Sequence, residues 1–72
     1  MKIEVMSHKG HELLSEVDEK TSPAELDRLD SELKKLMDQG YSAFLKESGL
    51  KIEKIDPSIK EDVVVIAPVM GG

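Results

Sequence analysis

The chain has no cysteine and no tryptophan, and its aromatic residues are one tyrosine and one phenylalanine. Without cysteine it forms no disulfide, binds no metal through thiolates and offers no thiol nucleophile. Two aromatic side chains, Tyr41 and Phe44, provide no platform on which successive nucleic-acid bases stack. The excess of 15 acidic over 10 basic residues gives a formal net charge of −5, which repels polyanions. We therefore expect no nucleic-acid partner.

The chain also lacks long apolar segments. Its 72 residues suffice for one small domain with a thin core and leave no room for a deep catalytic cavity. No apolar run follows Lys2, so no signal peptide is expected. The longest apolar run, 63–70, is far below the ~20 residues needed to span a bilayer. These features predict a cytoplasmic protein with no membrane partner.

The N-terminal part has the pattern of a β-hairpin. Residues 1–6 alternate between apolar and polar side chains, which is typical of a half-buried strand. The segment 7–10 reads as a turn that ends in glycine, and 12–17 is a second, weaker strand candidate. Together they predict two antiparallel strands.

The clearest local signal is the start of a helix at Ser22. Pro23 suits the first helical position, and Glu25 completes a capping box in which its amide and its carboxylate both bond to the capping residue. Apolar residues follow at helical spacing: Leu26, Leu29, Leu33, Leu36 and Met37. Gly40 is well placed to end the helix. A helix over 23–39 is predicted.

The segment 41–46 fits both a strand and a helical face, and the strand is favoured because 47–49 then forms a turn. A further turn is expected around 56–61. The run Val63–Ile66 is apolar at every position, so both faces of this last strand need cover. Pro68 ends it, because proline donates no hydrogen bond to a ladder.

This order predicts an α+β fold with a mixed sheet and one main helix packed on one face. The last strand, as the most apolar, belongs in the sheet centre, parallel to the first, which is the β-grasp topology. We expect a β-grasp domain over 1–67 and a flexible tail over 68–72 that ends in Gly71-Gly72.

The segment 60–72 resembles the end of the molybdopterin synthase small subunit and related sulfur carriers of the ubiquitin-like family. An acidic turn leads into an apolar strand, a proline, two apolar residues and two glycines. Glu61-Asp62 stands where many sulfur carriers have Gly-Asp. Val69-Met70 precedes the glycines where ubiquitin has arginines, which favours a sulfur carrier over a modifier.

The resemblance implies that an ATP-dependent activating enzyme adenylates the Gly72 carboxylate, which then becomes a thiocarboxylate for transfer to a sulfur-accepting enzyme. Gly71 has no side chain, so the backbone at the chain end can lie close to the nucleotide. The expected tail contacts to the activating enzyme are Pro68, Val69 and Met70. Two alternatives remain open: a modifier joined through Gly72 to target-protein lysines, and a noncovalent interaction subunit. In each the chain is no enzyme and holds no cofactor, since ATP belongs to the partner.

The apolar face of the last strand is the expected partner surface. Its side chains alternate between two faces, so either Val63 and Val65 or Val64 and Ile66 point outward, and the sequence does not decide which. His8 and His11 lie near Glu12 and are the only candidate metal ligands of note, but solvated histidines in a turn explain them better. No metal site is predicted.

Overall fold

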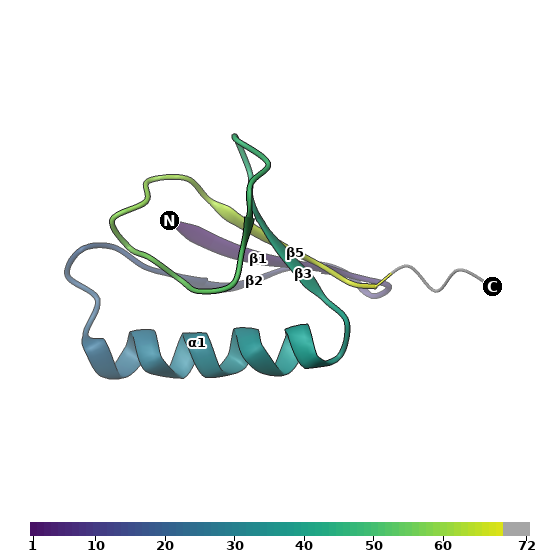
Figure 1. The fold of residues 1–72 in the computed structure, drawn as a ribbon, viewed down its shortest axis with the longest axis horizontal. Coiled ribbons are helices and arrows are strands. Elements are labelled where there is room, and N and C mark those ends of the chain that lie inside the picture. Colours follow the sequence, from purple (N-terminus) through teal and green to yellow (C-terminus); the bar gives the residue numbers. More distant parts are fainter. Residues whose placement is uncertain (69–72) are drawn as a thin grey trace.

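The computed structural model describes residues 1–68, which form an α+β fold with one helix packed against a five-stranded mixed sheet (Figure 1). In chain order the elements are β1 (Lys2–Ser7), β2 (Gly10–Glu16), α1 (Pro23–Asp38), β3 (Ser42–Leu45), β4 (Lys51–Ile52) and β5 (Val63–Ile66). The predicted hairpin, helix and last strand are therefore present. The strand reading of 41–46 is confirmed, because β3 occupies Ser42–Leu45.

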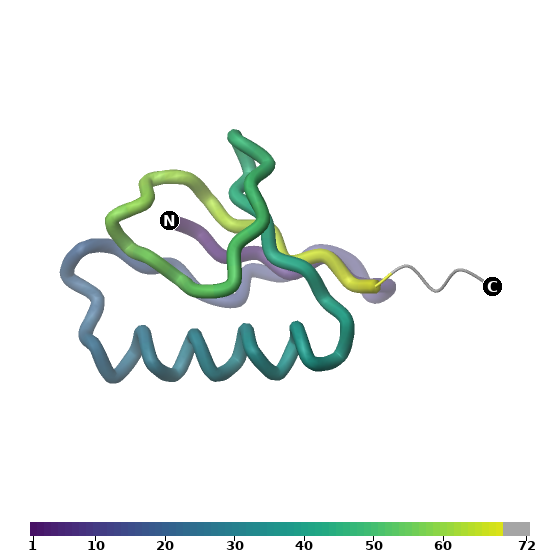
Figure 2. Tube along the Cα trace, viewed as in Figure 1, coloured from purple at the N-terminus to yellow at the C-terminus, as the bar shows by residue number. Residues whose placement is uncertain are grey.

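The strands lie in the order β2-β1-β5-β3-β4, so β5 is in the centre of the sheet. It runs parallel to β1, with Ile3 opposite Val63 and Val5 opposite Val65. It runs antiparallel to β3, with Ala43 opposite Val65. The trace in Figure 2 shows how the chain passes along the helix between the hairpin and the second half of the sheet. The expected central position of the last strand, parallel to the first, is confirmed, and the arrangement is compatible with a β-grasp.

The core lies between α1 and one face of the sheet. Its buried members are Ile3, Val17, Leu29, Leu33, Ala43, Leu45, Ile55, Val63 and Val65. Val63 and Val65 are fully buried, at 0 % exposure, whereas Ile66 is 41 % exposed and Val64 is half-buried. The apolar run of β5 thus divides by alternation, with Val63 and Val65 under the helix and Val64 and Ile66 on the other face of the sheet.

The connection between β4 and β5 is held against the helix by one buried side chain and one hydrogen bond. Ile55 is 7 % exposed and belongs to the core. Its amide donates to Asp30 Oδ1 on α1 over 2.9 Å. Asp56 and Ser58 then close a turn in which the Ser58 hydroxyl and amide both donate to the Asp56 carboxylate. These two hydrogen bonds lower the pKa of Asp56.

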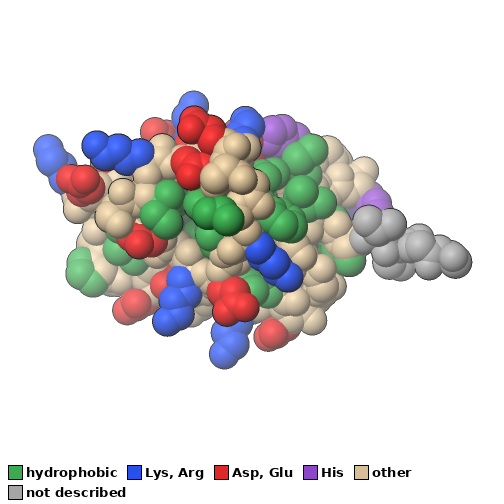
Figure 3. All heavy atoms as spheres, turned by 45° about the horizontal axis from the view of Figure 1, so that its top comes forward, with side chains coloured by type: hydrophobic (Ala, Val, Ile, Leu, Met, Phe, Trp, Pro, Cys, Tyr) green, Lys and Arg blue, Asp and Glu red, His purple; other side chains and the backbone are tan. Residues whose placement is uncertain are grey.

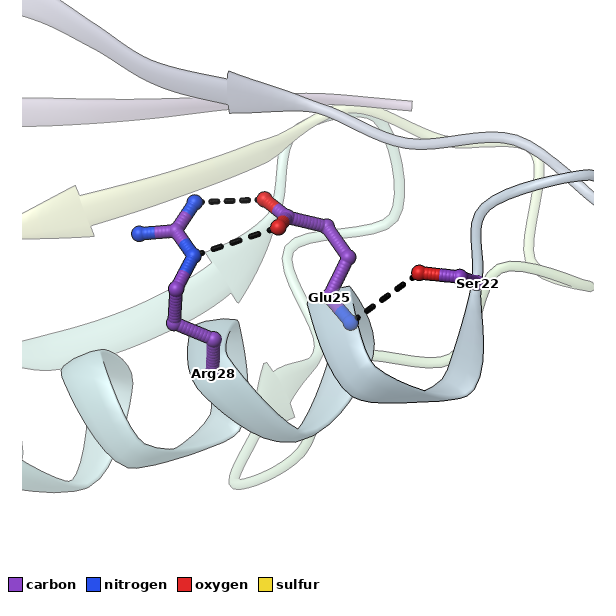
Figure 4. Close-up of polar contacts among 3 residues, drawn as sticks. All are labelled: Ser22, Glu25 and Arg28. Carbon is purple, nitrogen blue, oxygen red and sulfur yellow. Dashed lines mark hydrogen bonds and ion pairs between the residues drawn. The ribbon is translucent and has the colours of Figure 1, made fainter.

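Half of the expected capping box is present at the start of α1 (Figure 4). The Glu25 amide donates to Ser22 Oγ over 3.2 Å, as predicted. The Glu25 carboxylate does not reach back to the capping residue, because it pairs with the Arg28 guanidinium through Nε and Nη2. A bidentate guanidinium is a stronger partner than one amide. The hydrogen bond from Arg28 lowers the pKa of Glu25.

Replacing the capping residue tests this reading of the helix start. Ser22→Ala removes the acceptor of the Glu25 amide and should lower the free energy of unfolding by about 1 kcal/mol. The measurement is urea denaturation followed by circular dichroism. Ser31→Ala, an exposed change inside the same helix, is the matched control and should cause no loss of stability. Equal effects of the two substitutions would contradict the assignment of Ser22 as the cap.

Candidate functional site

The first part of the site is the place where the chain leaves the C-terminal end of β5. The Ala67 amide donates to the Met6 carbonyl over 2.9 Å and so extends the parallel ladder beyond Ile66. Pro68 follows, half-buried, and lies against Gly40. The last described residue is thus fixed at the end of the sheet where α1 ends. Val69, Met70, Gly71 and Gly72 lie outside the described residues, so their expected roles stay predictions.

The other end of β5 is fixed by two carboxylates. Glu61 Oε1 accepts hydrogen bonds from the amides of Glu47 (3.1 Å) and Ser48 (2.7 Å), in the turn between β3 and β4. Asp62 Oδ1 accepts from the Lys2 amide over 2.9 Å, at the start of β1. Hydrogen bonds to charged acceptors are stronger than those between neutral groups. Glu61 and Asp62 therefore tie the start of β5 to the segments on both sides of it.

The second part of the site is the sheet face turned away from α1. Residues opposite each other in a ladder share a face, and on this face Met6 lies opposite Ile66, and Val64 lies opposite Phe44. We define the outer apolar patch by its members: Met6, Leu13, Phe44, Val64 and Ile66. Met6 is 45 % exposed and Leu13 is 59 % exposed. Figure 3 looks obliquely at this side of the molecule and shows hydrophobic side chains gathered between charged ones.

A carboxylate at the patch, that of Glu4, contacts two side chains from other segments. Glu4 lies on the same face, opposite Val64, and its side chain is 18 % exposed. Its Oε2 is 2.9 Å from His11 Nε2 and 3.7 Å from Lys46 Nζ. The expectation that His11 is simply solvated is therefore incomplete, because His11 contacts a carboxylate. Among residues 1–68, no three His, Asp or Glu side chains gather in a way that would hold a metal ion.

Three members of the patch, Met6, Leu13 and Phe44, were not among the partner-surface residues expected from the sequence. A weak signal for Met6 exists, since it is apolar at a position where the alternation of β1 predicts a polar residue. Leu13 is followed directly by Leu14, and a bulge interrupts the pairing of β1 and β2 at this level. Leu13 lies on the turn side of this irregularity, opposite Glu4, in the register that starts with Ser7 opposite Gly10. Leu14 packs against the core while Leu13 is exposed on the outer face.

An open depression of about 420 Å³ lies at the opposite end of the sheet, between the chain after β2 and the turn before β5. Val17 and Ile59 line it together with Lys20 and Lys60. Residues from the start of β1 and from before β5 form this hollow, whereas Pro68 lies beyond the other end of these two parallel strands. The hollow and Pro68 therefore lie at opposite ends of the sheet.

The chain matches no protein-family model, no curated protein and no solved structure. Within residues 1–68, no helix has the length and apolar character required to cross a membrane.

The role assigned to Glu61 is testable by amide hydrogen exchange. Glu61→Ala removes the acceptor of the Glu47 and Ser48 amides, and these amides should exchange about tenfold faster. Glu53→Ala, which removes an exposed carboxylate elsewhere in the same half of the chain, is the control and should leave both rates unchanged. Unchanged exchange in the Glu61 variant would show that the carboxylate does not hold the turn.

Proposed function

We propose that this chain is a sulfur carrier with a ubiquitin-like β-grasp fold, activated by adenylation at Gly72. Two features support the proposal: the strand order β2-β1-β5-β3-β4 with a helix on one face, and a sequence that runs from the central strand through Pro68 to Gly71-Gly72. The observation that carries it is the position of β5, which is paired on both edges and continues directly into the terminal segment. A firmly held strand gives the C-terminal residues a defined starting point.

The chemistry requires little of the chain itself. A carboxylate oxygen of Gly72 attacks the α-phosphorus of ATP in the activating enzyme, and pyrophosphate leaves with the electrons of the broken P–O bond. Hydrosulfide then attacks the acyl carbon and displaces AMP, leaving a thiocarboxylate. An enzyme persulfide attacks in the same way to give an acyl disulfide, whose S–S bond a thiol then cleaves to yield the thiocarboxylate and a mixed disulfide. The five residues from Pro68 to Gly72 reach at most about 17 Å, enough to enter a channel of the partner. Glycine fits a narrow channel because it has no Cβ.

The same acyl-adenylate also serves the alternative function of a protein modifier. There the ε-amine of a target lysine attacks the acyl carbon, either directly or through an enzyme thioester, and AMP is released. The product is an isopeptide bond to Gly72. The third function, a noncovalent subunit, uses the outer apolar patch alone and needs no activation. These functions differ in their covalent products, so product analysis separates them.

The first test is the intact mass of the chain after reaction with the activating enzyme of the same cells, ATP and a sulfide source. We expect a mass increase equal to the exchange of one oxygen for one sulfur. A chain lacking Gly72 should stay unchanged, because its terminal carboxylate no longer reaches the nucleotide. Pyrophosphate release measured in parallel reports the adenylation step by itself.

The other outcomes identify the alternatives. Trypsin cleaves after Lys60, so a modifier would leave residues 61–72 attached to target lysines in a digest. Adducts of that kind without a thiocarboxylate would replace the carrier with the modifier. A chain that is never adenylated or conjugated, although the activating enzyme and ATP are present, would leave only the noncovalent subunit.

The outer apolar patch is the proposed docking surface for the activating enzyme, with Val64 and Ile66 in contact rather than the buried Val63 and Val65. Ile66→Glu places a charge in the centre of this contact and should weaken binding at least about tenfold. Leu50→Glu is the matched control, because Leu50 is 62 % exposed and lies outside the patch. Isothermal titration calorimetry measures both. Equal affinities for the Ile66 variant and the native chain would remove the patch from the docking surface.

A further inference from the structure

The end of α1 forms a rigid support beside the exit of the chain. The Gly40 amide donates to the Met37 carbonyl over 2.9 Å, and the Tyr41 amide donates to the Leu36 carbonyl over 3.0 Å. Gly40 has a φ of +97°, a conformation that closes helix ends and that residues with a side chain rarely adopt. Tyr41 packs against the core just after it. Gly40 is therefore held in place from both sides.

Pro68 lies directly against this support. A β-carbon built on Gly40 would be 3.2 Å from Pro68 Cβ and 3.4 Å from Pro68 Cγ. Such distances are shorter than ordinary carbon–carbon contacts, so the absence of a side chain at Gly40 is what lets the proline ring approach. The proline ring also restricts its own φ to about −65°. A glycine held by the hydrogen bonds of the helix end and a proline with a restricted φ thus meet where the described part of the chain ends.

We propose that the contact between Gly40 and Pro68 positions the C-terminal glycines for activation, an inference that rests on the proposed function. Four residues follow Pro68, and an extended chain of this length reaches about 13 Å. A tilt of about 30° at Pro68 would displace its end by roughly 7 Å, because the displacement grows with the length of the segment. The contact holds Pro68, from which those four residues continue, at the end of the sheet beyond Ile66.

The substitution Gly40→Ala tests the contact, and Gly49→Ala is its matched control. Gly49 also has a positive φ, +74°, so alanine is strained at both positions. Within residues 1–68, a β-carbon built on Gly49 has no heavy atom within 4 Å other than those of the glycine and its chain neighbours, whereas one built on Gly40 meets Pro68. Backbone strain is therefore common to the two variants, and displacement of Pro68 is specific to the first.

The direction of the terminal segment is measured without any partner. The chain has no cysteine, so Lys9→Cys, in the exposed turn after β1, gives a single position for a nitroxide label. We expect Gly40→Ala to change the paramagnetic broadening of the Gly71 and Gly72 amide signals, with Gly49→Ala behaving as the native chain. If Gly40→Ala does not fold, Pro68→Gly removes the ring from the contact, leaves the helix end intact, and should change the same signals. Broadening equal to that of the native chain, in a folded variant, overturns the proposal.

The consequence for activation is measured as ATP–pyrophosphate exchange by the activating enzyme. We expect Gly40→Ala to raise KM about threefold or more with kcat unchanged, because a misdirected end enters the channel less often but reacts normally once there. A changed direction without a changed KM would overturn the link to activation. If even the native chain is not adenylated, the proposed function fails, and the label measurement alone decides whether the contact directs the chain end.

Discussion

The structure depends on the burial of one face of β5 between two paired neighbours. Val63 and Val65 are completely buried, and the backbone around them is bonded to β1 on one edge and to β3 on the other. Full burial of a valine side chain contributes about 1.5–3 kcal/mol. The N-terminal hairpin and the β3–β4 pair contact each other only through this strand in the sheet order. Any displacement of β5 would therefore separate the two halves of the sheet.

Both ends of β5 are fixed by interactions other than apolar packing. Glu61 and Asp62 bond to backbone amides at its start, and Ala67 bonds to Met6 at its end. The chain contains no cysteine, so these hydrogen bonds take the place that a covalent link holds in many small domains. The Glu61 side chain is long enough to reach the turn between β3 and β4, where it accepts from the Glu47 and Ser48 amides.

Local signals in the sequence predicted the local structure well. The capping serine, Pro23 and the leucine spacing predicted a helix over 23–39, and α1 occupies Pro23–Asp38. The central place of β5 followed from its composition, because the most apolar strand needs the most cover. Which side chains of β5 point away from the helix was not predictable, since an unbroken apolar run shows no alternation between apolar and polar residues. The pairing of Glu25 with Arg28 was also missed, because two partners compete for one carboxylate and the sequence does not rank them.

Contacts between distant segments were the part of the site that the sequence could not supply. Pro68 was expected to end the last strand, but its contact with Gly40 arises only when the helix end and the strand end meet. Leu13 joins the patch because the hairpin register, with Ser7 opposite Gly10, places it opposite Glu4, and that register is a property of the pairing rather than of Leu13 alone. Glu4 of β1 likewise contacts Lys46, which directly follows β3. Such features depend on register and topology, which are properties of the whole sheet.

The proposed docking surface and the chain end are coupled because β5 carries both. Ile66, in the outer apolar patch, is followed by Ala67 and Pro68, so patch and exit are separated by about 7 Å of extended chain. The Glu4 carboxylate in this region contacts His11 Nε2 and Lys46 Nζ. A partner that covers Ile66 thus already lies next to Pro68. Under the proposed function, the activating enzyme would then bind without a conformational change in the sheet, because β5 and the end of α1 already hold Pro68 in place.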